Sequence, residues 1–134
     1  MILLICKIKE GIILITEDDI DIHNLIKDIL KKEKYDVISA YSVAEALLAI
    51  EENNIDLILL DLMLPELSGE ELIKKIKEVP IIVISAKISP EDKVNALLNG
   101  ANDYLTKPFN TNELLARIKV QLRIKKNNKG DVLS

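Results

Sequence analysis

The stretch "GIILITEDDIDIHNLIKDILKKE" (residues 11–33) joins a short apolar run to a helix-like segment, and this pairing decides the fold class. Residues 11–16 are apolar and β-branched, as in a buried strand. Residues 21–33 then carry apolar side chains at helical spacing. These positions are Ile22, Leu25, Ile26, Ile29 and Leu30. A strand followed by an amphipathic helix is the repeating unit of α/β proteins.

The same pairing recurs four more times along the chain. The sequence predicts further strands over residues 35–40, 56–60, 80–85 and 103–106, and further helices over residues 42–53, 69–78, 90–100 and 111–126. Near-continuous apolar strands separated by helices indicate a parallel sheet with both faces covered. The prediction is therefore a flavodoxin-like doubly wound α/β fold, with five parallel strands in the order 2-1-3-4-5 and five helices.

Length and composition suit one folded domain, because the chain has 134 residues, of which 49% are hydrophobic and 30% charged. We expect residues 11–125 to form this domain. The polar, turn-rich residues 126–134 are predicted to be a linker or C-terminal tail. Residues 1–10 stay unassigned, with an added edge strand, an upstream extension and a frayed end all open.

Charge and cysteine content narrow the class of protein. Lys and Arg total 18 against 22 Asp and Glu, a formal net charge of -4, which argues against this domain binding nucleic acid by itself. Cys6 is the single cysteine, so no disulfide framework or cysteine metal site is expected. No apolar run reaches the roughly 20 residues of a membrane span, and the first ten residues lack signal-peptide features. We expect a cytoplasmic protein without membrane contact.

Polar side chains follow the strands where such a fold builds its site. Doubly wound sheets bind ligands beyond the carboxyl ends of their strands, near the point where the strand order reverses. Glu17 and Asp18 follow the first strand and Asp61 follows its neighbour, the third. Ser85 follows the fourth strand and Lys107 the fifth. The sequence predicts one crevice that holds three carboxylates, with a hydroxyl and an ammonium group at its rim.

A divalent cation would balance this crevice, since three acids and one lysine leave two negative charges uncompensated. Oxygen ligands without Cys or a neighbouring His favour a hard ion, and we predict Mg²⁺. An Asp in such a site can act as a nucleophile toward a phosphoryl group. The metal and Lys107 would stabilise the negative charge on the transferring oxygens.

Four blocks of the sequence together resemble the signature of response regulator receiver domains of two-component signalling. They are "ILITEDD", "DLILLDLMLPELSG", "PIIVISAK" and "GANDYLTKPF", and the resemblance covers roughly residues 12–124. It implies that Asp61 is the phosphoacceptor, that Asp18 binds Mg²⁺ directly and that Glu17 binds it through water. A histidine kinase would be the phosphodonor.

The resemblance also implies roles for residues around these acids. Met63 would offer its backbone carbonyl to the metal, and Ser85 would be the switch hydroxyl. Tyr104 would be the aromatic side chain whose rotation follows. Lys107 would pair with the phosphoryl group, and the Lys107-Pro108 peptide bond would be cis. Such a domain phosphorylates itself from phosphodonors and slowly loses the group, as a signalling relay and not a metabolic enzyme.

The block "LTKPFNTNELLARIKVQLR" resembles the winged-helix (OmpR/PhoB-type) subclass in particular. Those receivers form homodimers on phosphorylation through the helix at 90–100, the strand at 103–106 and the helix at 111–126. The matching ion-pair positions are Lys93, Asp103, Glu113 and Arg117, and the matching apolar positions are Val94, Leu97 and Leu115. Transcription would be controlled through a DNA-binding output domain that is absent here, and a stand-alone receiver is the alternative.

The sequence departs from the family pattern in one link, and three other functions are possible for such a fold. The link before residue 80 is about three residues shorter than is usual in that family, which predicts an early end to the helix at 69–78. His23 has no matched partner and is expected on the surface. The rivals are a flavin or nucleotide module, which the acidic loop disfavours, a hydrolase built on Asp61, and a degenerate receiver that acts as a scaffold.

Overall fold

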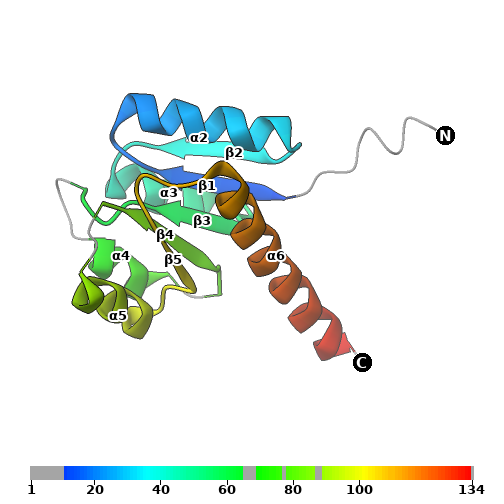
Figure 1. Cartoon of the computed structure of the whole chain (residues 1–134). Coiled ribbons are helices and arrows are strands. Elements are labelled where there is room, and N and C mark those ends of the chain that lie inside the picture. The colour runs from blue at the N-terminus through cyan, green and yellow to red at the C-terminus, as the bar shows by residue number, and fades with distance from the viewer. Residues whose placement is uncertain (1–10, 65–68, 77, 87–88, 134) are drawn as a thin grey trace.

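The computed structural model describes residues 11–64, 69–76, 78–86 and 89–133, with side chains described for all of these except residues 69–71 and 126–133 (Figure 1). The strands are β1 (Ile12–Thr16), β2 (Asp36–Ala40), β3 (Leu57–Leu60), β4 (Ile81–Ser85) and β5 (Asp103–Thr106). The helices are α2 (Ile20–Lys32), α3 (Val43–Glu52), α4 (Gly69–Lys75), α5 (Pro90–Asn99) and α6 (Thr111–Leu133).

The five strands form one parallel sheet in the order β2-β1-β3-β4-β5, which confirms the predicted topology. Thr16 at the end of β1 lies opposite Ala40 in β2 and Leu60 in β3. These three strands therefore end level with one another. The residues that follow them, Glu17, Tyr41 and Asp61, leave the sheet at the same edge.

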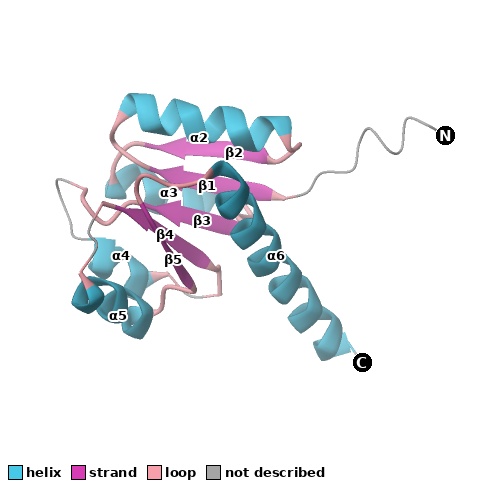
Figure 2. Cartoon of the chain, viewed as in Figure 1, coloured by secondary structure: helices cyan, strands magenta, loops and turns pink. Residues whose placement is uncertain are grey.

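Helices cover both faces of the sheet, so the strands form the middle layer (Figure 2). On one face, Ile26 of α2 and Ile118 of α6 are buried in a core with the odd-numbered residues of β1 and β3. On the other face, Ala46 of α3, Leu72 of α4 and Ala96 of α5 are buried in a second core. Alternate strand residues feed the two cores, as expected for a sheet buried on both sides.

Side-chain caps fix where three helices begin. Asp19 accepts a hydrogen bond from the amide of Ile22 at 3.1 Å and so starts α2 directly after the acidic stretch. Ser42 caps α3 through the amide of Glu45 at 3.2 Å. The Glu45 carboxylate accepts from the backbone amide of Tyr41 at 3.0 Å, which resembles a capping box displaced by one residue.

Two predicted helices end at other residues than 78 and 126: the third ends earlier, and the fifth ends later. The predicted helix over 69–78 ends at Lys75, which agrees with the shortened link before β4. The last helix was predicted to end at residue 126 but continues to Leu133. The assignment of residues 126–134 as a linker or tail stays a prediction. Residues 1–10 lie outside the described part of the chain.

Within the part of the chain that the structure describes, no helix combines the length and the apolar character needed to cross a membrane.

Candidate functional site

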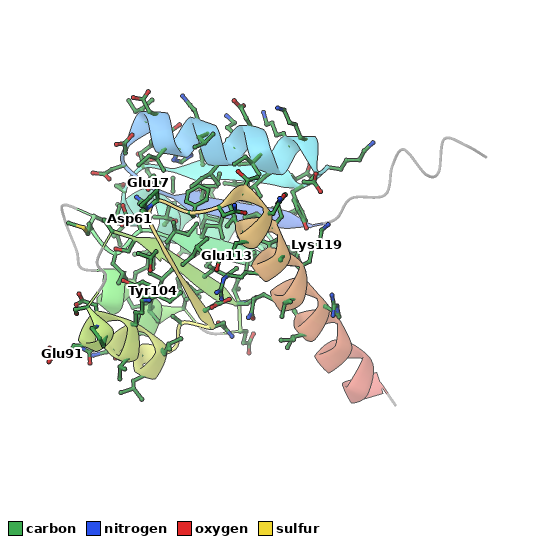
Figure 3. All side chains as sticks on the ribbon, viewed as in Figure 1. Glu17, Asp61, Glu91, Tyr104, Glu113 and Lys119 are labelled. Atoms are coloured by element: carbon green, nitrogen blue, oxygen red, sulfur yellow. The ribbon has the colours of Figure 1, made fainter. Side chains whose placement is uncertain are left out.

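Neighbouring strands bring Glu17 and Asp61 to the same point at the carboxyl edge of the sheet. The amide of Asp61 donates to the carbonyl of Thr16 at 3.0 Å, which extends the β1–β3 pairing past the strand ends. The amide of Glu17 donates to the carbonyl of Ala40 at 3.1 Å and does the same toward β2. Figure 3 shows the two acidic side chains next to each other at this edge.

The three predicted acids form a cluster. One carboxylate oxygen from each of Glu17, Asp18 and Asp61 lies within 4.8 Å of the other two. Glu17 is 2% exposed and Asp61 6% exposed, whereas Asp18 faces solvent. The site thus has a buried floor and an open mouth, so a ligand can reach the acids from the solvent side.

Lys107 is the cation of this cluster. Its ammonium Nζ lies 2.6 Å from Glu17 Oε1 and 3.1 Å from Asp61 Oδ2. The backbone amide of Lys107 donates to the carbonyl of Ser85 at 2.9 Å, which ties the lysine to the end of β4. The Lys107-Pro108 peptide bond is cis, the geometry that the family resemblance implies.

Backbone amides orient the two buried carboxylates. The amide of Met63 donates to Asp61 Oδ1 at 3.0 Å, and the amide of Asp19 donates to Glu17 Oε2 at 3.2 Å. The ammonium group of Lys107 donates hydrogen bonds to the other oxygen of each carboxylate, Glu17 Oε1 and Asp61 Oδ2. Each buried acid is therefore held at both oxygens, and its orientation is set before any ligand arrives.

The pKa of the Glu17 carboxyl is raised to about 7: burial is the largest cause, the hydrogen bond from Lys107 acts in the opposite direction, and the nearby Asp61 adds to the rise. For Lys107, burial lowers the pKa, but its hydrogen bonds to Glu17 and Asp61 outweigh burial and leave the pKa above its ordinary value. At Glu17, burial therefore outweighs the hydrogen bond from Lys107, and the charge of Asp61 adds to the effect of burial.

The donor set fits a hard divalent cation. Three carboxylates converge with no cysteine or histidine side chain in the cluster, and oxygen-only ligands of this kind suit Mg²⁺. A second positive charge at the solvent side of the cluster would offset the repulsion between Glu17 and Asp61, which adds to the effect of burial on the Glu17 pKa.

Ser85 and Tyr104 lie on the face of the sheet covered by α3, α4 and α5. Ser85 is fully buried at the end of β4, and Tyr104 is 8% exposed in β5. The ammonium group of Lys93 on α5 lies 5.8 Å from the centre of the Tyr104 ring. This places a charged residue of α5 over the ring that is predicted to switch.

The predicted dimer residues lie on α5, β5 and α6. Arg117 bonds both carboxylate oxygens of Asp103, at 2.7 and 2.8 Å, and also pairs with Glu113 at 3.0 Å. Val94 and Leu97 are exposed on α5. In contrast, Leu115 is half-buried against the core under α6. Arg117 therefore forms its ion pairs with residues of the same chain. The dimer itself stays a prediction.

His23 was predicted to lie on the surface, and this prediction is wrong. Its side chain is fully buried, not exposed. Its Nδ1 lies 2.9 Å from the carbonyl oxygen of Glu17, and its ring stacks on Tyr41 with centroids 4.2 Å apart. Positions 23, 26 and 30 are the buried line of α2, while Leu25 is 53% exposed. This line was readable as an i, i+3, i+7 pattern that includes the histidine.

Comparison with known protein families gives a match: the family model of the response regulator receiver domain covers residues 13–119. The chain belongs to the response regulator receiver family. It is thus a receiver domain of two-component signalling. The structure brings together the three acids and the lysine that the motifs indicated, which are Glu17, Asp18, Asp61 and Lys107.

Named relatives agree with this assignment. The receiver is 45% identical over 114 residues to the regulatory protein VanR of Enterococcus faecium, covering 83% of this chain and 49% of VanR. It therefore spans about half the length of that relative.

Solved structures show the same fold. A CheY-like receiver domain protein from Methanospirillum hungatei superposes with a TM-score of 0.84 at 34% identity, over 88% of this receiver and 98% of the other chain. NtrX from Brucella abortus superposes with a TM-score of 0.86 at 30% identity, over 91% of this receiver and 29% of NtrX.

Proposed function

We propose that this receiver accepts a phosphoryl group from a histidine kinase onto Asp61, with Mg²⁺ bound by the neighbouring acids. The observation that carries the proposal is the convergence of Glu17, Asp18 and Asp61 within 4.8 Å, with Lys107 bonded to two of them. A carboxylate nucleophile, a metal-binding pair and a fixed cation are the parts that phosphoryl transfer requires.

The chain's own residues divide the work. An oxygen of Asp61 attacks the phosphorus of the phosphohistidine; a P–O bond forms as the P–N bond breaks, and the imidazole leaves with the electron pair. The Met63 amide and Lys107 hold Asp61 in place, 3.0 and 3.1 Å from its two oxygens. Lys107 then shifts its ion pair from the carboxylate to the phosphoryl oxygens.

In this proposal Asp18 would bind Mg²⁺ directly and Glu17 would bind it through water. Asp61 and the backbone carbonyl of Met63 would be the remaining protein ligands. When bound, the ion neutralises negative charge on the transferring phosphoryl group. Asp18 is exposed at the open side of the cluster, which supports its direct contact with an ion that arrives from solvent.

The phosphoryl group then acts as a switch. The Ser85 hydroxyl moves toward it, and the Tyr104 ring takes up the space that Ser85 leaves. This shifts an equilibrium between two arrangements of the surface formed by α5, β5 and α6. The support is placement: Tyr104 lies in the core that contains Ala96 of α5, Lys93 of α5 lies over its ring, and Ser85 is buried at the end of the neighbouring strand β4.

The output is proposed from the resemblance to the winged-helix subclass. The switched surface forms a homodimer through exposed Val94 and Leu97 and through exchange of the Arg117 ion pairs. A DNA-binding domain beyond this chain would control transcription. The 49% coverage of VanR supports a further domain in the whole protein. An unphosphorylated scaffold is the second candidate, and the complete set of site residues disfavours it.

Intact mass spectrometry tests the phosphoacceptor. The purified chain is incubated with Mg²⁺ and acetyl phosphate, in parallel with Asp61→Asn and with Asp28→Asn, which changes an exposed acid on α2. We expect one added phosphoryl group on the wild type and on Asp28→Asn, and none on Asp61→Asn. Chelation of Mg²⁺ should abolish the adduct.

A folded wild type that binds Mg²⁺ but gains no phosphoryl group would contradict the proposal and favour the scaffold. Sustained turnover of small phosphomonoesters would instead support the hydrolase.

A further inference from the structure

His23 is a buried polar side chain directly behind the acidic cluster. Its relative exposure is 0%, and its Nδ1 contacts the carbonyl oxygen of Glu17 at 2.9 Å. The backbone of His23 also donates to the carbonyl of Asp19 at 2.9 Å, in the first turn of α2. One residue of the helix thus touches two of the acidic residues that precede it.

The hydrogen-bonding chemistry of this contact has a fixed direction. A carbonyl oxygen accepts only, so Nδ1 carries the hydrogen and donates to Glu17. The other ring nitrogen, Nε2, is buried and has no hydrogen-bond partner among the described residues. Leaving a buried polar atom unpaired is unfavourable. An apolar residue would fill the same place without this cost, so the histidine needs an explanation beyond packing.

With this contact, both backbone polar groups of Glu17 are hydrogen-bonded. On one side, the Glu17 amide donates to the carbonyl of Ala40, at the end of β2. On the other side, its carbonyl accepts from His23. The His23 ring stacks at 17° on Tyr41, the residue that follows Ala40. The end of β2 and the start of α2 therefore hold the Glu17 peptide from both directions.

We propose that His23 is a positioning residue for the metal site: its Nδ1–H bond to the Glu17 carbonyl sets the orientation of the Glu17 carboxylate. This inference deepens the proposed function and rests on it for its chemical meaning. A hydrogen-bond partner of a direct metal ligand typically alters metal affinity by about 10–100-fold. Because Glu17 would bind the ion through water, the effect of His23 is expected at the lower end of this range. His23 itself touches neither metal nor phosphoryl group and is not a catalytic residue.

Three variants separate positioning from packing. His23→Phe keeps a ring to stack on Tyr41 but removes the donor. His23→Asn loses the ring but keeps an N–H donor near the position of Nδ1. Leu30→Ala, a fully buried site two turns further along α2, lowers stability without contacting the acidic stretch.

Two quantities are measured on each variant. The first is the Mg²⁺ dissociation constant, obtained by calorimetric titration. The second is the exchange rate of the Asp19 amide hydrogen in the presence of chelator. That amide bonds Glu17 Oε2 at 3.2 Å, so its protection reports the carboxylate's place without any metal.

We expect His23→Phe to bind Mg²⁺ roughly tenfold more weakly and to exchange the Asp19 amide roughly fivefold faster. His23→Asn should stay near the wild type in both measurements, even where it melts at a lower temperature. Leu30→Ala should lower the melting temperature and change neither quantity.

The inference is overturned if His23→Phe matches the wild type in both measurements, or if His23→Asn loses as much as His23→Phe. If the wild type binds no Mg²⁺, the proposed function fails. The amide exchange of the metal-free variants then still decides whether His23 positions Glu17.

Discussion

Glu17 illustrates what the site demands of a single residue, because its carboxylate is buried beside another acid. Its folded-state pKa of about 7 lies above the ordinary value of 4.5. The folded chain therefore holds a proton that the unfolded chain has lost between these two pH values. The stability gained from that proton is complete below about pH 4.5 and is lost as the pH rises through about 7.

We therefore predict that Glu17→Gln removes part of the pH dependence of folding. In chelator, the wild type should lose on the order of 2 kcal/mol of unfolding free energy between pH 4.5 and 7, relative to Glu17→Gln. Urea unfolding at a series of pH values measures this. Parallel curves for the two proteins would contradict the raised pKa.

At this scale, the sequence located the acids and the lysine because strand ends and topology place them. Glu17, Asp61 and Lys107 follow three different strands, and the order of a doubly wound sheet brings those ends together. His23 escaped the same reasoning because its partner is a backbone carbonyl. No residue type in the sequence marks a carbonyl as a partner, so the helix phase was the only available signal.

Asp56 shows how side chains join the ends of elements at the opposite edge of the sheet. Its Oδ2 accepts from the amide of Ile12 at 2.8 Å, at the start of β1. Its Oδ1 pairs with Lys125 of α6 at 3.2 Å. The Lys125 ammonium also bonds the carbonyl of Ile55 at 3.3 Å. One carboxylate thus connects β1, the entry to β3 and the later turns of α6.

We expect Asp56→Ala to lower the unfolding free energy by about 1 kcal/mol, since the Ile12 amide loses its acceptor. Asp56→Asn should lose less because its amide oxygen can still accept that bond. Asp28→Ala, which changes an exposed acid on α2, is the control. Chemical denaturation measures all three. Equal stabilities for Asp56→Ala and Asp28→Ala would show that this junction contributes nothing.

Element types were predictable, and element ends were less so. Fully apolar strands and amphipathic helices follow from periodicity alone. The extension of α6 to Leu133 did not, because "NNKG" at residues 127–130 disfavours a helix by intrinsic propensity. Propensity is a weak guide at helix ends, where neighbouring turns and tertiary contacts such as Lys125 with Asp56 also act.

The whole molecule is a sheet whose two faces have separate cores, with the acidic cluster at one edge. Figure 1 shows α6 crossing in front of the sheet, with its C-terminal end projecting beyond the other elements. The surface made by α5, β5 and α6 carries both exposed apolar side chains and closed ion pairs. This combination is suited to a partner that opens the pairs and covers the apolar groups.

We predict that beryllofluoride with Mg²⁺, as a mimic of the phosphoryl group, raises the dimer fraction of the wild type. Arg117→Ala should reduce that fraction several-fold, because Arg117 supplies the ion pairs to be exchanged. Lys119→Ala removes a charge from the same helix, where the ammonium is 3.9 Å from Glu33, and serves as the control. Light scattering measures the mass. A monomeric wild type with the mimic bound would contradict the dimer.

Assignment of the phosphorylated residue decides whether Asp61 is the phosphoacceptor. The chain is treated with acetyl phosphate and Mg²⁺ and then reduced with borohydride, which converts an aspartyl phosphate to homoserine. Peptide mass spectrometry locates the change. If Asp61 is the phosphoacceptor, homoserine should appear at position 61 alone. Conversion at Asp18 or another acid, or a phosphoryl group on a side chain that borohydride leaves unchanged, would contradict it.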